Sequence, residues 1–229
     1  MKQLFSYPLY IFYKSFESIG QYCMLLLHAI KAIPKCITHL EVITNLIFSI
    51  GIKSIPIVIF TSLFSGMVTA VQAAYQFNMD LGVATVPNQI VGGVIGGSIL
   101  IELAPMITGL VMTGKIGATI AAEIGSMRVS EQIDALEALS FDPVAYLIMP
   151  RILTAFIMFP IFIMVADLFG IIGGMITSIN TMPGDFTTAI FLRGFKDTFR
   201  LWDVIFGIIK GTTFGLAITS IACYKGYYT

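Results

Sequence analysis

The chain has 229 residues, of which 57% are hydrophobic and only 11% charged, and its mean hydropathy is +0.91. A soluble domain carries roughly 25% charged residues, so this composition indicates an integral membrane protein. The formal net charge is zero, with thirteen basic and thirteen acidic residues, which excludes the overall basic field that would attract nucleic acid. Because no linker divides the sequence, we expect one all-α membrane domain over residues 1–229.

Residues that could carry catalysis are few and have no suitable spacing. The three cysteines (Cys23, Cys36 and Cys223) and the two histidines (His28 and His39) show no metal-ligand pattern. We expect the cysteines to fill apolar space and the histidines to lie at an interface. The sequence also lacks a nucleophile elbow and a P-loop. It therefore predicts a chain that is not an enzyme, binds no cofactor or metal and cannot itself hydrolyse ATP.

The N-terminal region, residues 1–40, is too polar to span a bilayer. Its lysines alternate with clusters of Phe, Tyr, Leu and Ile, and Pro34 interrupts it. The order of segments found in a secretory signal is absent. We expect an interfacial amphipathic helix whose lysines face anionic lipid, with a helix packed on the bundle as the alternative.

Four later stretches are apolar and long enough to cross a membrane, which needs about 20 residues. Small residues in the second, including Gly92 and Gly96, predict close helix packing, and Pro105 predicts a bend. Asp142 and Pro143 are typical of an N-cap and first turn at the start of the third. The expected spans lie at about residues 40–72, 90–122, 146–179 and 201–224.

A short charged helix at residues 130–140 separates the second and third spans and must lie outside the hydrocarbon. Ser130 is expected to cap it, with Glu131 and Asp134 in its first turn, where carboxylates oppose the helix dipole favourably. Ile133, Leu136 and Leu139 supply an apolar side, and Glu137 extends the acidic side. The pattern fits either a docking helix or a solvated connector.

Lysine and arginine residues suggest the orientation. With a cytoplasmic N-terminus, most of them fall at the inner face, and the short helix is cytoplasmic. Three cations then lie on the opposite side and weaken the asymmetry: Arg193, Lys196 and Arg200. We expect residues 180–200, which contain them, to form a polar loop with some helical character.

The stretch from Glu102 to Arg151 closely resembles the signature of the MlaE (YrbE) family of ABC-transporter permeases. The resemblance rests on ELAPMITGLVMTGKIGATIAA and on EIGSMRVSEQIDALEALSFDPVAYLIMPR, with a GxMRVxEQIDAL core, and extends more loosely over about residues 66–226. It implies the permease subunit of an ATP-driven transporter that moves phospholipids or related lipids with an MCE-domain partner. It also implies a homodimer in a bacterial inner membrane, with the plastid inner envelope as the alternative.

The same resemblance assigns the short helix to coupling. Two ATPase subunits, which bind the ATP and Mg, would receive it in a groove on the cytoplasmic side. The coupling residues would be Ser130, Glu131, Gln132, Ile133, Asp134, Ala135, Leu136 and Glu137.

Ionisable residues inside the spans suggest a lipid site, because such groups are costly in the bilayer and usually paired or wet. At 1.5 Å per residue, Glu102 lies about 35 Å from the cytoplasmic end of its helix. We expect Lys210 to neutralise Asp167 or Glu102, and take Asp167 with Lys210 as the intramembrane charge pair; fixed pairs without substrate contact are the alternative. The expected lipid-binding residues are Glu102, Leu103, Gln72, Tyr75 and Gln76.

Two features depart from the family pattern. Ile101 stands where members usually carry an arginine, so a charge pair between those neighbours is lost. Members also continue beyond the CYKG-like segment to a last span, so we expect either a piece of a longer chain or the absence of that span. Two other classes of function stay open: a membrane scaffold that recruits a soluble partner through residues 130–140, and an ion-coupled channel or transporter that uses the intramembrane charges.

Overall fold

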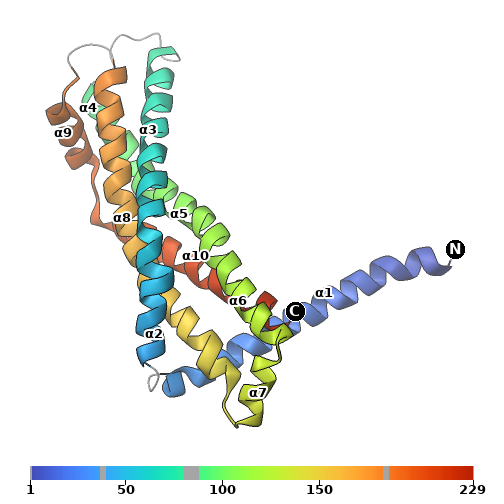
Figure 1. Ribbon diagram of the computed structural model, residues 1–229. Helices are drawn as coiled ribbons and strands as arrows, with labels where there is room; N and C mark the ends of the chain where they lie inside the picture. Colours follow the sequence, from blue (N-terminus) through green and yellow to red (C-terminus); the bar gives the residue numbers. More distant parts are fainter. Residues whose placement is uncertain (1, 37–39, 80–87, 183–185, 229) are drawn as a thin grey trace. The chain divides into compact units, whose positions relative to one another are not determined.

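The computed structural model describes residues 2–36, 40–79, 88–182 and 186–228, and all regular structure in these ranges is helical (Figure 1). Short π-helical (η2, η4, η5, η6) and 3-10 (η3) segments interrupt the α-helices. The elements are α1 Lys2–Cys36, α2 Leu40–Leu46, η2 Ile47–Gly51, η3 Ile52–Ser54, α3 Ile55–Met79, α4 Asn88–Ser98, η4 Ile99–Leu103, α5 Ala104–Met112, η5 Thr113–Gly117, α6 Ala118–Val129, α7 Gln132–Ala138, η6 Val144–Ile148, α8 Met149–Thr181, α9 Thr188–Thr198 and α10 Leu201–Tyr227.

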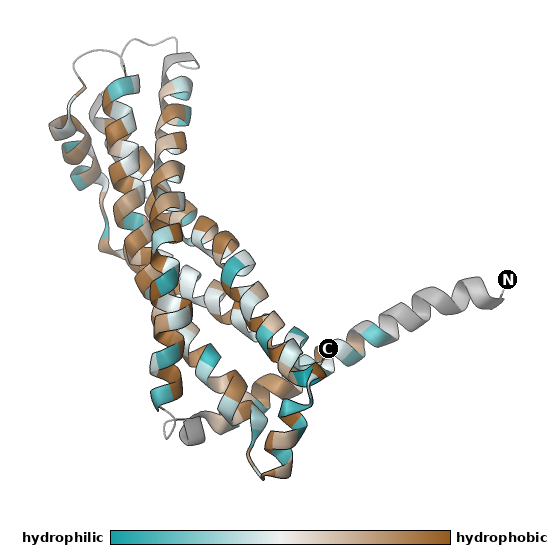
Figure 2. Ribbon diagram, viewed as in Figure 1, coloured by the Kyte–Doolittle hydropathy of each residue, from teal (hydrophilic) through white to brown (hydrophobic). Residues whose placement is uncertain are grey.

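Within the described residues, four helical stretches are long and apolar enough to cross a membrane, as predicted. Figure 2 shows hydrophobic residues along most of their length. The predicted all-α membrane bundle is therefore confirmed. The second stretch runs further than expected, to residue 129 rather than about 122, because its helix continues through polar residues. The four stretches are Glu41–Gln76, Ile90–Val129, Val144–Thr181 and Leu201–Tyr227.

Three of these stretches contain π-helical segments. One of them, η4 at Ile99–Leu103, directly precedes Pro105, which lies in the first turn of α5. Proline lacks an N–H and clashes with the preceding turn, so an irregular turn ahead of it has a physical cause. The structure has a widened turn at this place, while the predicted bend stays a prediction. Glu102 lies within it.

The chain forms two compact units built from interleaved segments. Unit 1 comprises residues 1–46, 117–154 and 219–229, and unit 2 comprises residues 47–116 and 155–218. Each unit is described by itself below. The prediction of one permease domain stays a prediction.

Unit 2 is packed through glycines. Gly66 of α3 meets the backbone of Gly170 in α8, so closely that an added Cβ would collide with it. Gly92 of α4 meets the backbone of Phe191 in α9 in the same way, and Gly96 lies against the Phe195 ring, which confirms the predicted close packing. Small residues let helix backbones approach where burial of apolar surface drives little association.

Unit 1 joins α1 to the helix ends around α7. Tyr22 of α1 lies 2.7 Å from the hydroxyl of Ser220 in α10, and His28 Nε2 lies 3.2 Å from Asp142 Oδ2. The described side chains of α1 form an exposed apolar stripe and a buried one, the latter at Leu25 and Ala29. The predicted N-terminal helix is therefore present with one buried face, while its place as an amphipathic helix at the membrane interface stays a prediction.

Candidate coupling helix and intramembrane ion pair

The short charged helix exists, and its start differs from the prediction. It is α7, Gln132–Ala138, with Asp134 in the first turn as expected. Ser130 does not cap it: its hydroxyl donates to the Ser126 carbonyl at 2.7 Å, closing α6 instead. Glu131 takes the N-cap position in the left-handed region, with φ 58°. A residue in the left-handed conformation cannot continue a right-handed helix, so the chain changes direction between α6 and α7 at Glu131.

One side of α7 borders an apolar groove with a volume of about 330 Å³. Ile133 of α7 is fully buried, whereas Leu139 at the end of the groove is 69% exposed. Glu131, Asp134 and Glu137 are exposed. This element therefore presents acidic groups beside an accessible apolar hollow lined by Met127, Gln132, Ile133, Ala135, Leu136, Leu139, Tyr146 and Leu147.

A polar cluster ties α7 to two other helices. Arg128 of α6 pairs with Asp134 at 2.6 Å, and its guanidinium lies 5.9 Å from the ring centre of Tyr227 in α10. The Tyr227 hydroxyl donates to Glu137 at 3.4 Å. A displacement of α7 would therefore pull on both α6 and α10.

The two helices that flank α7 are also joined at a buried point. Arg151 of α8 is 6% exposed and contacts Glu123 of α6 at 3.1 Å, while its second terminal nitrogen donates to the Leu147 carbonyl at 2.8 Å. Asp142 accepts from the backbone N–H of Val144 at 3.1 Å, which confirms its predicted role as a cap. These contacts fix the corners where the chain leaves and re-enters the spans.

The intramembrane charges pair differently from the prediction. Lys210 Nζ lies 2.6 Å from Glu102 Oε2, with side-chain exposures of 23% and 61%. The Asp167 carboxyl is 6% exposed, and neither oxygen has a hydrogen-bond partner among the described residues. The predicted Asp167–Lys210 pair is therefore wrong, and the Glu102–Lys210 alternative is present. Asp167 is buried in α8, whereas the Glu102 side chain is largely exposed.

The predicted lipid-binding residues fall into two groups on unit 2. Leu103 lies next to Glu102 and lines a small hollow with Ser62 and Ser65 of α3. Gln72 is two turns beyond Ser65, roughly 10 Å along the helix at 1.5 Å per residue. The second group is exposed on α3 and consists of Gln72, Tyr75 and Gln76.

Two functional candidates were missed by sequence reasoning. Tyr227 and Arg151 contact partners 90 and 28 residues away, and no local pattern marks such long-range contacts. Among the described residues, no group of three or more His, Cys, Asp or Glu could hold a metal ion.

Long apolar helices joined by a short polar helix define a polytopic membrane protein. Its family follows from sequence comparison. The profile of the family described as "Permease MlaE" matches residues 43–229. The chain therefore belongs to the MlaE family of ABC-transporter permeases, as the resemblance predicted.

Curated relatives support the same assignment. A probable ABC transporter permease protein of Rickettsia conorii is 37% identical over 216 residues, covering 93% of this chain and 80% of the relative. The chloroplastic protein TRIGALACTOSYLDIACYLGLYCEROL 1 of Arabidopsis thaliana is 34% identical over 179 residues, 78% of this chain and 49% of that one. The intermembrane phospholipid transport system permease protein MlaE of Haemophilus influenzae is 29% identical over 213 residues, 93% and 79% of the two chains.

Proposed function

We propose that this permease moves phospholipids as the membrane subunit of an ATP-driven transporter. A separate ATPase, which binds the ATP and Mg, docks at α7, and a second copy of the permease completes the lipid path. The observation that carries the proposal is α7 itself, an exposed acidic helix beside an apolar groove, on a chain of the MlaE permease family. The name of the Haemophilus influenzae relative supports the substrate class.

The groove and the acidic face favour docking over a solvated connector. A connector needs no accessible apolar hollow, and burying this one against a partner would be favourable at about 25 cal/mol per Å². Val129 and Phe141, at the two ends of the α7 region, are 76% and 52% exposed. Exposed apolar groups around a charged helix are typical of a protein interface. We assign this interface to the ATPase.

The Glu102–Lys210 pair supports the lipid assignment. Glu102 is largely exposed within unit 2, so a zwitterionic or anionic headgroup can reach the pair without unfolding a helix. An acyl chain extends over about 15 Å, half of the hydrocarbon core. It would thus reach from Glu102 and Leu103 toward Tyr75. The lipid headgroup would then contact the Glu102–Lys210 pair, and the acyl chain would contact α3.

An apolar stripe along α3 supports the second copy and the lipid. Its members recur every three or four residues and are 38–67% exposed, so they share one helix face. This face suits a partner permease with lipid held between the two chains. The stripe consists of Ile57, Phe60, Phe64, Val68, Val71 and Tyr75. An MCE-domain protein and an inner-membrane location complete the proposal by family resemblance.

The test is to co-express the permease with the ATPase encoded beside it, purify the complex in detergent, and measure bound ATPase and bound phospholipid. Glu131→Lys reverses an exposed charge at the start of α7 and is expected to reduce ATPase recovery at least about tenfold. Glu17→Lys, an equal reversal on exposed α1, is the matched control. Glu102→Gln is expected to lower bound phospholipid while ATPase recovery stays unchanged, with Glu41→Gln as its control.

Charge reversal separates lipid binding from a fixed structural pair. Glu102→Lys combined with Lys210→Glu retains an ion pair but inverts its direction. We expect this double variant to fold and still lack bound phospholipid. Full recovery of lipid would show that the pair acts only within the helices. Wild-type protein that recovers neither ATPase nor lipid would sink the transporter proposal and favour the scaffold alternative.

A further inference from the structure

The segment between the third and fourth spans, expected to be a polar loop with some helical character, contains α9, which packs tightly on α4 within unit 2. Phe191 is fully buried, and its backbone lies against Gly92 of α4. Gly194 is also buried, and Thr198 lies over Gly93. This packing fixes which side of α9 faces outward.

Three exposed cations lie on α9 and just after it. Arg193 and Lys196 are three residues apart on α9, so they share one side of that helix, and Arg200 lies in the connection between α9 and α10. Among the described residues, none of the three has an ion-pair partner within 4.0 Å, although Asp197 lies on the same exposed side. In the predicted orientation these three cations lie on the side of the membrane opposite to most Lys and Arg residues, so the positive-inside rule does not account for them.

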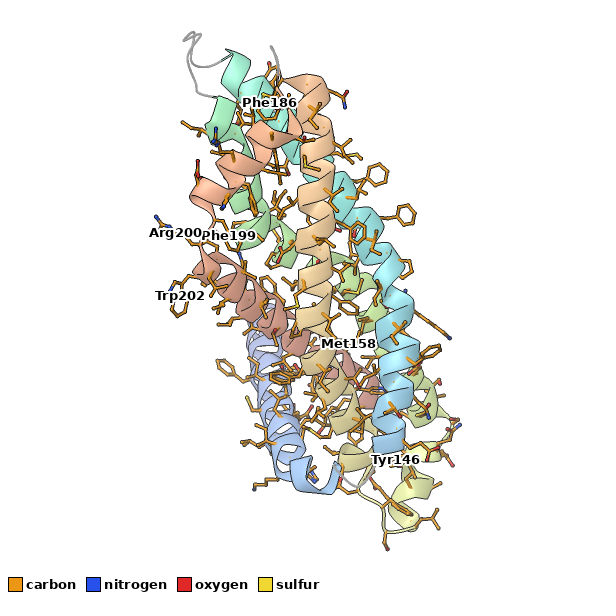
Figure 3. All side chains as sticks on the ribbon, turned by 90° about the vertical axis from the view of Figure 1, so that its left-hand side faces the viewer. Tyr146, Met158, Phe186, Phe199, Arg200 and Trp202 are labelled. Carbon is orange, nitrogen blue, oxygen red and sulfur yellow. The ribbon has the colours of Figure 1, made fainter. Side chains whose placement is uncertain are left out.

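Large apolar side chains adjoin the cations. Phe199, Leu201 and Trp202 are 43%, 67% and 75% exposed, and Trp202 is the only tryptophan in the chain. Figure 3 shows the side chains of Arg200 and Trp202 extending away from the helices on the same side. Leu201 is the first residue of the fourth candidate span. The cations therefore lie where the hydrocarbon begins, which is also where Trp residues gather in membrane proteins.

We propose that Arg193, Lys196 and Arg200, with Trp202, form a binding surface for anionic lipid headgroups at the start of the fourth span. The guanidinium and ammonium groups pair with lipid phosphates, and the indole ring anchors at the headgroup level. A soluble acidic partner fits less well, because the adjoining Leu201 and Trp202 are exposed apolar side chains in the first turn of a candidate span. This surface goes beyond the transport proposal and does not depend on it.

The single tryptophan allows a direct test in the whole chain. The purified protein is reconstituted in phosphatidylcholine vesicles that contain either brominated phosphatidylglycerol or brominated phosphatidylcholine at the same mole fraction, and Trp202 quenching is measured. One basic side chain near an anionic surface changes partitioning about fivefold. We expect phosphatidylglycerol to quench at least about fivefold more effectively, and the preference to fall as salt is added.

Two triple variants distinguish this surface from general charge. The first variant combines Arg193→Gln, Lys196→Gln and Arg200→Gln, and we expect the two brominated lipids to quench its Trp202 equally. The control variant combines Lys14→Gln, Lys31→Gln and Lys53→Gln, which removes as many exposed cations elsewhere, and should keep the preference for phosphatidylglycerol. Far-UV circular dichroism verifies that both remain helical. Equal quenching of the wild-type protein by the two brominated lipids would overturn the proposal. An unchanged preference for phosphatidylglycerol in the first variant would also overturn it. If the first variant loses a protein that copurifies with the wild type, the surface binds that protein instead.

Discussion

At the scale of single residues, the charges of unit 1 differ in what surrounds them. Arg151 is almost fully buried, and its charge is balanced mainly by Glu123, whose side chain is 45% exposed. Arg128 and Asp134 form a shorter pair in a far more exposed setting. Removing one partner of a buried pair strands a desolvated charge, whereas an exposed pair contributes about 0–1 kcal/mol. Burial, rather than distance, decides which pair matters for stability.

We predict that Glu123→Gln destabilises the protein by about 1–3 kcal/mol, because it leaves the buried Arg151 charge without its counter-ion. Arg151→Met removes the charge together with its need for a partner and should cost less. Thermal unfolding in detergent, followed by circular dichroism, checks the order. Asp134→Asn is the exposed-pair control, with an expected change below about 1 kcal/mol. Arg151→Met proving the least stable of the three would contradict this account.

At the scale of elements, α7 does not stand alone between two spans. Its middle is tied to α6 through Arg128 and Asp134, and its last turn to α10 through Glu137 and Tyr227. Lys210 lies on the same α10 helix as Tyr227. Motion of α7 would therefore act first on the ends of α6 and α10 that belong to unit 1.

We predict that Tyr227→Phe lowers the phospholipid moved per ATP hydrolysed about two- to fivefold while the ATPase stays bound. The change removes one hydrogen bond at 3.4 Å and keeps the ring over Arg128, a loss of about 1 kcal/mol. Lipid transfer between vesicles and phosphate release, measured on one preparation, give the ratio. Tyr228→Phe is the neighbouring control, since the Tyr228 ring contacts Tyr224 and Tyr227 while its hydroxyl has no hydrogen-bond partner among the described residues. Equal ratios for both variants would show that α10 takes no signal from α7.

At the scale of the molecule, unit 2 depends on positions where no side chain fits. Gly66 and Gly173 lie against the backbones of α8 and α3 respectively, whereas Gly97 of α4 has nothing within 4 Å of an added Cβ. A flexible side chain could yield to an extra methyl group, but a backbone carbonyl cannot. The same residue type therefore has opposite consequences at different positions.

We predict that Gly66→Ala destabilises unit 2 by about 1–3 kcal/mol through overpacking against α8. Gly97→Ala should be neutral or stabilising by up to about 1 kcal/mol, since alanine is the better helix former. Expression yield and thermal unfolding of the two variants in detergent check the contrast. Similar behaviour of both variants would mean that the α3–α8 contact tolerates separation.

The helices could be predicted because hydropathy and short-range signals determine them. The four spans, the helix at 132–138 and the cap at Asp142 all follow from a few neighbouring residues. The cap at Ser130 was wrong because the same hydroxyl can close the preceding helix. The partner of Lys210 could not be chosen between two carboxylates at similar depth, because helix rotation, which π segments alter, decides which carboxylate faces it. The lipid-binding and coupling roles stay predictions.

The π-helical segments also affect how this chain compares with others. A widened turn holds an extra residue in a helix that otherwise continues, and η4, η5 and η6 each lie inside a candidate span. A related permease with a regular α-helix at one of these places would align with this chain only through a one-residue gap within the membrane. Gaps in such alignments, normally assigned to loops, would then mark the turns where Glu102 and its neighbours are held.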